Sequence, residues 1–122
     1  MKFREALNYG ANGASEYQDV LAAGNYLRSR KDVDKERIGL WGGSYGGYLT
    51  AMGLAKNSDI FASCVDIQGA HDWNIIIKNF RPSYNPLAKP DFAKRAFESS
   101  PMNFIKSWKS PVLLIHGDDD RN

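Results

Sequence analysis

The sequence feature that most constrains the fold is the segment Gly42-Gly43-Ser44-Tyr45-Gly46, in which one serine lies among glycines. The short run Arg37–Trp41 comes directly before it and is expected to form a buried strand. Tyr45–Lys56 follows, with Tyr, Leu, Met and Ala at spacings that favour a helix. The chain is therefore expected to pass from a strand through a tight turn into a helix, in which glycine accepts close backbone approach at no steric cost.

The pattern G-x-S-x-G in this context is typical of a nucleophile elbow, whose strained turn lifts a serine hydroxyl above the sheet. We interpret Ser44 as a nucleophile; a glycine-rich turn without chemistry is the alternative. A helix that begins at Tyr45 would favour negative charge at its N-terminus, so the Tyr45 backbone N–H is the expected oxyanion donor. A second donor should come from an earlier loop, and Gly10 and Gly13 are poor candidates because they precede a helix.

A serine nucleophile needs a histidine base, and that histidine needs a carboxylate to orient it. With this elbow the chain order is Ser, then Asp or Glu, then His. Three carboxylates, Asp118 to Asp120, follow the predicted strand Pro111–His116. His71 precedes them and His116 ends the strand, so we expect structural roles for both histidines and a catalytic histidine outside this chain.

The aspartates at 118–120 have a second interpretation as oxygen ligands of a divalent cation. A calcium loop needs more oxygen ligands at alternating positions, and His116-Gly117 ahead of the acids does not fit that pattern. We therefore expect no metal site.

The remaining elements alternate between strands and helices, which predicts an α/β fold with a mostly parallel sheet. Ser15 and Gln18 have the spacing of a capping box at the start of the first helix. The expected strand is Phe61–Ile67, besides the two already given, and the expected further helices are Ser15–Arg30, Asp72–Asn79 and Asp91–Glu98.

Composition excludes several classes of function. The 122 residues allow one domain, and the net charge is only +2. The densest charged stretch, 28–37, mixes acids with bases, which argues against nucleic-acid binding. No run has the length of a signal peptide core or a membrane span, so we expect no membrane contact. The single cysteine, Cys64, lies in an apolar run and is expected to be buried and unreactive.

Three segments together resemble the prolyl oligopeptidase family of serine peptidases, an α/β-hydrolase family. They are Val33-Asp34-Lys35-Glu36-Arg37-Ile38, Trp41-Gly42-Gly43-Ser44-Tyr45-Gly46-Gly47-Tyr48 and Pro111-Val112-Leu113-Leu114-Ile115-His116-Gly117. Tyr45 followed by Gly46-Gly47-Tyr48 is more similar to the dipeptidyl-peptidase IV and acylaminoacyl-peptidase branches than to prolyl oligopeptidase itself. The likeness covers nearly the whole chain.

The resemblance implies roles for particular residues. Counted from His116-Gly117, the catalytic acid of the family falls on Asp120. Asn122, two positions later, would contact the substrate carbonyl, and Trp73 would lie near the pocket for the residue before the cleaved bond. The implied substrate is a peptide, with cleavage after proline or a small residue as one expectation, and the implied mechanism uses no cofactor.

The resemblance also implies that residues 1–122 are the central part of a catalytic domain, without the N-terminal propeller, the first strands and the segment that carries the histidine. Unpaired sheet edges are then expected, with self-association through them. Two other functions stay open at this point: an esterase or lipase of the same fold, and a non-catalytic association module.

Overall fold

The computed structural model describes residues 8–120. Every predicted strand and helix is present, with ends that differ from the prediction by at most two residues. Within this range, three 3-10 helices (η) were not predicted. The elements in chain order are η2 (Gly10–Asn12), α1 (Tyr17–Ser29), β1 (Gly39–Gly43), α2 (Tyr45–Asn57), β2 (Ser63–Ile67), α3 (Trp73–Phe80), η3 (Pro86–Ala88), α4 (Pro90–Glu98), η4 (Pro101–Ser107) and β3 (Val112–Ile115).

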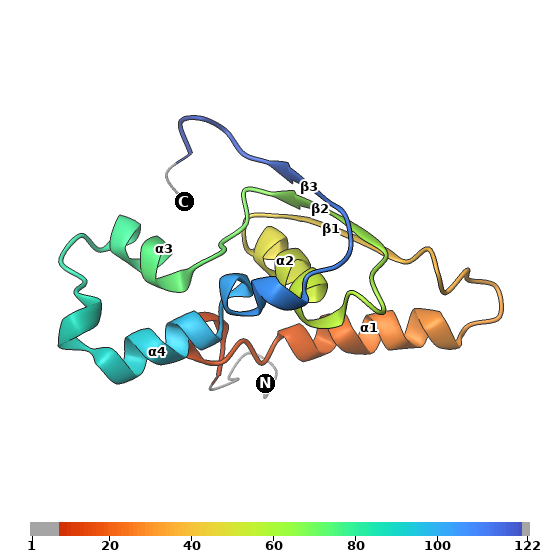
Figure 1. Ribbon diagram of the computed structural model, residues 1–122, viewed down its shortest axis with the longest axis horizontal. Helices are drawn as coiled ribbons and strands as arrows, with labels where there is room; N and C mark the ends of the chain where they lie inside the picture. The colour runs from red at the N-terminus through yellow and green to blue at the C-terminus, as the bar shows by residue number, and fades with distance from the viewer. Residues whose placement is uncertain (1–7, 121–122) are drawn as a thin grey trace, which may run out of the picture.

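The strands form one parallel sheet in the order β1-β2-β3 (Figure 1). Trp41 pairs with Val65, and Val65 pairs with Leu113, so these side chains share one face of the sheet. Parallel neighbours need a helical crossover, and α2 supplies it between β1 and β2. All three strands therefore end at the same edge of the sheet, which confirms the predicted α/β class.

The core lies between the sheet and α2, whose inward side chains Tyr48, Ala51 and Leu54 are fully buried. Figure 1 shows α1, α2 and η4 on the same side of the sheet. Burial of each large apolar side chain contributes about 1.5–3 kcal/mol. The buried members of the two core clusters are Ile38, Leu54, Ile60, Phe61 and Cys64 in one, and Ala14, Tyr17, Tyr48 and Met52 in the other.

The opposite face of the sheet is open among the described residues. Trp41 on β1 is 78% exposed, and Leu113 and Ile115 on β3 are 57% and 45% exposed. Parallel sheets are usually covered on both faces. This apolar surface is therefore a place where further chain would be expected to pack.

The predicted capping box at the start of α1 is wrong. Glu16 occupies the N-cap position with helical backbone angles and makes no side-chain cap bond, while the Ser15 hydroxyl is buried without a partner among residues 8–120. The Glu16 carboxylate instead accepts the Gly10 N–H, at 3.0 Å and 3.3 Å from its two oxygens. The side chain at the start of α1 therefore bonds to the preceding loop and not to its own helix.

Tyr17 joins α1 to the end of α2, because its hydroxyl donates to Asn57 Oδ1 at 2.6 Å. Its side chain is only 1% exposed, and burial raises its pKa above the usual value, so the hydroxyl remains a donor. We expect Tyr17→Phe to lower the free energy of unfolding by about 1 kcal/mol, because the Asn57 oxygen loses its donor. Urea denaturation measures the change.

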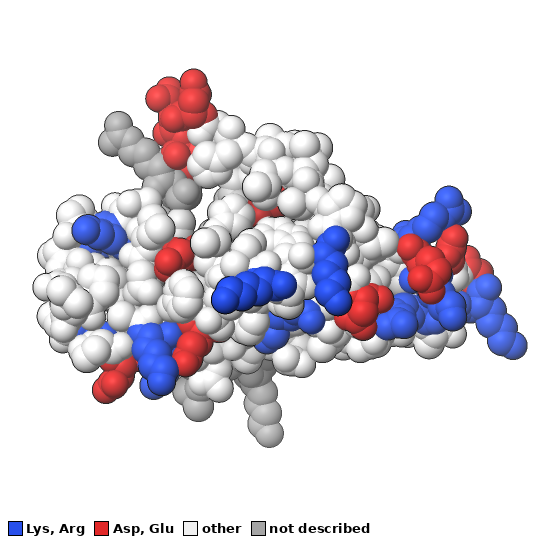
Figure 2. All heavy atoms as spheres, in the orientation of Figure 1, with Lys and Arg blue, Asp and Glu red and all other residues white. Residues whose placement is uncertain are grey.

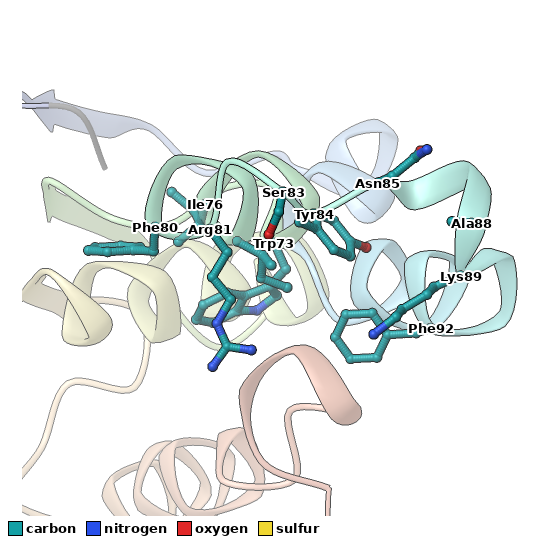
Figure 3. A pocket seen from close by; sticks show the side chains of 11 residues that line it. Trp73, Ile76, Phe80, Arg81, Ser83, Tyr84, Asn85, Ala88, Lys89 and Phe92 are labelled. Atoms are coloured by element: carbon teal, nitrogen blue, oxygen red, sulfur yellow. The ribbon is translucent and has the colours of Figure 1, made fainter.

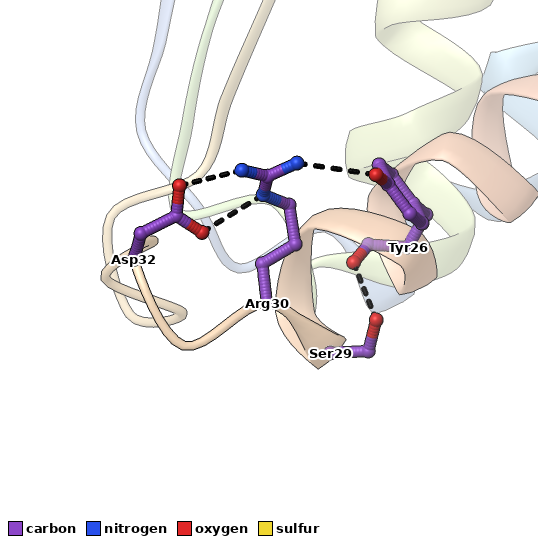
Figure 4. A network of polar contacts seen from close by, with 4 residues as sticks. All are labelled: Tyr26, Ser29, Arg30 and Asp32. Atoms are coloured by element: carbon purple, nitrogen blue, oxygen red, sulfur yellow. Dashed lines mark hydrogen bonds and ion pairs between the residues drawn. The ribbon is translucent and has the colours of Figure 1, made fainter.

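Tyr26→Phe is the matched control, on the exposed side of the same helix. The Tyr26 hydroxyl accepts from Arg30 at 3.1 Å, and Arg30 also pairs with Asp32 (Figure 4). Exposed networks of this kind stabilise little, so we expect a change below about 0.5 kcal/mol. Equal losses in the two variants would contradict the assigned role of Tyr17.

Charges of both signs are interspersed on the surface. In Figure 2, blue and red side chains lie together at the end of the molecule that carries the loop after α1. Two ion pairs belong to that loop, Arg30–Asp32 and Arg37–Asp34. The local alternation agrees with the sequence reading of residues 28–37 as a solvated, mixed-charge stretch.

Candidate active site

Ser44 stands at the corner between β1 and α2, with φ 54° and ψ −118°. This left-handed backbone is strained for a residue with a side chain. The Ser44 N–H donates to the Ile67 carbonyl at 2.8 Å, and the Ser44 carbonyl accepts the Tyr48 N–H at 3.0 Å. The turn is thus fixed to β2 and to α2, and the Ser44 residue is exposed.

Gly42 is the glycine of this corner that has no room for a side chain. A Cβ at Gly42 would lie 2.5 Å from both the carbonyl carbon and the oxygen of Gly46. A Cβ at Gly46 would meet nothing within 4 Å apart from its chain neighbours and the backbone of its own helix. The prediction that the glycines around the serine are required by close packing therefore holds for Gly42, whereas Gly46 contributes through its backbone.

Tyr45, the first residue of α2, has a side chain held on several sides. Its ring stacks on Tyr9 with centroids 5.2 Å apart and contacts the rings of Tyr48 and Trp73. Its hydroxyl donates to Glu16, and burial, followed by that bond, raises its pKa. These contacts fix the backbone at Tyr45, whose N–H is one of the helix-start donors without an intrahelical acceptor.

Gly10 does not offer a second oxyanion donor. Its N–H is already bonded to the Glu16 carboxylate, as described above. Its φ of +53° places it in the left-handed region. The prediction that Gly10 is a poor candidate for the second oxyanion donor thus has a structural reason.

Asp120 lies in the turn after β3, where its N–H donates to the Gly117 carbonyl at 3.1 Å. It is partly buried, whereas Asp118 and Asp119 are exposed. Since β1 and β3 flank β2, the turns that carry Ser44 and Asp120 leave the same edge of the sheet, with strands about 10 Å apart. Ser44 and Asp120 therefore both lie at the C-terminal ends of the strands.

Gln68 follows β2 and lies between these two turns. Its φ is +55°, and its N–H donates to the Ile115 carbonyl at 2.8 Å. Since the Ser44 N–H donates to Ile67, the ends of the three strands are tied to one another by backbone bonds. The sheet edge is therefore a rigid base for the site.

Trp73 begins α3 and contacts the nucleophile helix, with its ring 5.0 Å from that of Tyr48 and 5.9 Å from that of Tyr45. It also lines a cavity of about 780 Å³ between α3, η3 and α4 (Figure 3). The wall is mainly apolar and aromatic, with basic side chains added. Its residues include Ile76, Ile77, Phe80, Tyr84 and Phe92, together with Arg81 and Lys89.

The sequence analysis did not foresee a role for Asp66. This residue of β2 is 1% exposed, and its Oδ2 lies 2.6 Å from His71 Nε2. The signal was an aspartate within an otherwise apolar strand, five residues before a histidine. The expected structural role of His71, held by a hydrogen bond, is confirmed. In the other histidine, His116, the Nε2 atom lies 3.4 Å from the Asp120 carbonyl oxygen.

Cys64 is 4% exposed, and burial raises the pKa of its thiol to about 11, as expected of an unreactive cysteine. Asn122 lies outside the described residues. Between residues 8 and 120, no cluster of three or more His, Cys, Asp or Glu side chains could hold a metal ion. In the same range, no helix has the length and apolarity needed to cross a membrane.

A serine at a strained strand-to-helix corner of a parallel sheet, with an acid beyond a later strand at the same edge, defines an α/β hydrolase. The chain belongs to the prolyl oligopeptidase family, a family of serine peptidases whose sequence profile matches residues 1–122.

Individual relatives agree with this membership. The chain is 33% identical to human dipeptidyl peptidase 8 over 127 residues, and 30% identical to bovine dipeptidyl peptidase 4 over 112 residues. These alignments cover 100% and 90% of this chain, but 14% and 15% of the relatives. An acylaminoacyl peptidase solved with Z-Gly-Gly-Phe-chloromethyl ketone superposes with a TM-score of 0.69 at 30% identity, over 92% of this chain and 19% of that structure.

Proposed function

We propose that this chain is the central part of the catalytic domain of a serine peptidase, with Ser44 as its nucleophile. The observation that carries the proposal is the backbone of Ser44, which is strained, bonded to β2 and α2, and exposed at the strand ends. Strain of this kind costs about 1–3 kcal/mol and persists mainly at functional sites. Family membership supports the choice of peptide chemistry.

In the proposed mechanism, the Ser44 hydroxyl attacks the peptide carbonyl and forms an acyl-enzyme. A histidine from another part of the enzyme takes the hydroxyl proton and passes it to the leaving amine, and the Asp120 carboxylate orients that histidine. The Tyr45 N–H stabilises the oxyanion together with the dipole of α2. In the second half of the reaction, the histidine takes a proton from a water molecule, which attacks the acyl-enzyme. The histidine then returns the proton to Ser44 as the acyl group leaves.

The pocket that begins at Trp73 would receive the side chain before the cleaved bond. Its apolar and aromatic wall favours an apolar residue, proline included, over a basic one, because Arg81 and Lys89 also line the pocket. The related acylaminoacyl peptidase was solved with a chloromethyl ketone that carries phenylalanine, which is consistent with an apolar pocket. Asn122 would contact the substrate carbonyl, as the resemblance implies.

The chain spans about 15% of the length of the curated relatives it matches. The open face with Trp41, Leu113 and Ile115 would be covered by further chain of the same enzyme, as in other parallel sheets. When these 122 residues are produced alone, the same surface would favour self-association, with β3 as an exposed edge strand.

Kinetics of the enzyme that contains this segment test the proposal. We expect Phe- and Pro-containing peptide anilides to be cleaved with kcat/KM of about 10⁴ M⁻¹s⁻¹ or more. A p-nitrophenyl butyrate control measures esterase activity on the same preparation. Turnover of the ester with no cleavage of any anilide would contradict the peptidase and favour an esterase of the same fold.

A further inference from the structure

Asp66 is a buried carboxylate that the proposed mechanism does not use. It pairs with Gly42 of β1 in the sheet register, and its side chain faces α2 and has no exposed surface. Its Oδ2 bonds to His71 at 2.6 Å, while its Oδ1 is buried with no partner among the described residues. A buried charge costs several kcal/mol unless it is paired, so His71 is the group that makes this carboxylate tolerable.

Two glycines enclose the Asp66 carboxylate. A Cβ at Gly47 on α2 would lie 2.5 Å from Asp66 Oδ1, and a Cβ at Gly69 would lie 2.3 Å from the same atom. Gly69 also lies against Gly47, with a Cβ at Gly69 only 2.7 Å from the Gly47 carbonyl carbon. The loop after β2 thus packs directly on the first turn of the nucleophile helix, with Asp66 between them.

The same loop leads to the substrate pocket. Within this loop, the His71 side chain bonds to Asp66. The His71 backbone carbonyl accepts the Met102 N–H at 3.2 Å. Two residues later, the Trp73 backbone N–H donates to Ser100 Oγ at 3.0 Å, and the Trp73 ring packs on Tyr45 and Tyr48. The Asp66–His71 bond therefore fixes the segment that presents Trp73 to the pocket.

We propose that Asp66 and His71 are positioning residues for substrate binding, because their hydrogen bond holds the loop 68–72 on α2 and thereby sets the place of Trp73. The inference rests on the proposed peptidase function. It assigns these residues no part in the chemistry at Ser44, so their loss should affect KM more than kcat.

Removing one partner and removing both should have different effects. In His71→Leu the carboxylate stays buried without its partner, because leucine has no donor, so the loop must open to hydrate it, and Trp73 moves. In Asp66→Asn the charge is gone, and a neutral bond to His71 can form. Unpaired buried charges cost more than neutral replacements of both partners, so Asp66→Asn should rescue His71→Leu.

The test uses the enzyme that contains this segment, with a Phe anilide as substrate and a small fluorophosphonate as the probe of Ser44. We expect His71→Leu to raise KM about tenfold, with kcat and the labelling rate within about threefold. The double variant Asp66→Asn/His71→Leu should return KM to within about threefold. Asp72→Asn is the matched control, because asparagine caps α3 equally well, and it should leave KM within about twofold.

An unchanged KM in His71→Leu, or a double variant that is worse than both singles, would overturn the positioning role. A collapse of the labelling rate in His71→Leu would also overturn it, because His71 would then act in the chemistry. If His71→Leu does not fold while the double variant folds with a near-normal KM, the inference stands; if neither folds, it fails. A wild-type enzyme that cleaves the anilide without labelling at Ser44 would overturn the proposed function itself.

Discussion

Replacing Ser44 with alanine is expected to lower kcat by about 10⁴- to 10⁶-fold in the enzyme that contains this segment, because the variant has no hydroxyl to form the acyl-enzyme. The fold should be unaffected. Ser44 is exposed, and alanine has the same Cβ as serine, so the substitution removes only the hydroxyl and adds no steric constraint on the backbone. Anilide kinetics and a thermal melt measure the two effects separately.

Ser63→Ala is the matched control, because Ser63 is an exposed serine at the opposite end of the sheet. Its activity should stay within about twofold of wild type, as for surface substitutions in general. If the Ser44 variant kept more than a tenth of the wild-type kcat, the nucleophile would have to be another residue.

Replacing Gly42 with alanine is expected to lower the free energy of unfolding by about 3 kcal/mol. The added methyl group would lie 2.5 Å from two backbone atoms of Gly46. The Gly46 backbone cannot change rotamer to relieve the clash as a flexible side chain could, so β1 must move away from α2. The same movement would displace Ser44, and activity should fall together with stability. Urea denaturation and anilide turnover measure both.

Gly46→Ala carries the same change of residue at a position with open space, since an added Cβ would meet nothing within 4 Å apart from its chain neighbours and the backbone of its own helix. It lies in the first turn of α2, where alanine is favoured over glycine by up to about 1 kcal/mol. We therefore expect unchanged or slightly higher stability. Equal destabilisation by the two alanines would mean that the corner is not packed as described.

Local sequence signals predicted the elements well where glycine and proline mark their ends. Ser44 could be placed because a strand, a glycine turn and a helix occur in direct succession, and each part restricts the others. The 3-10 helix Pro101–Ser107 was missed because it has no periodic apolar pattern of its own and packs against α2. Its stability comes from tertiary contacts that a local pattern does not contain.

Two carboxylates whose roles were not predicted from the sequence show the same limit. The Glu16 side chain accepts from Gly10, six residues away, and from the Tyr45 hydroxyl, 29 residues away along the chain. Asp66 lies in an apolar strand, and only the return of the chain at His71 shows why a charge is tolerated there. Periodicity identifies buried faces, but it does not identify the partner of a buried polar group.

The assignment of Asp120 as the acid depended on the family pattern, because local sequence signals do not distinguish between three adjacent aspartates. The structure distinguishes them in one respect, since Asp120 is partly buried and the other two are exposed. Its role as the acid stays a prediction of the resemblance. The placement of its turn beside those of Ser44 and Gln68 follows from the strand order β1-β2-β3.

The most direct test of the account is peptide mapping by mass spectrometry after the enzyme has been inactivated with a fluorophosphonate. The account predicts one adduct, on the Ser44 hydroxyl, with no adduct and no inactivation in a Ser44→Ala protein treated in the same way. Inactivation with the adduct on a different residue, and Ser44 unmodified, would contradict it.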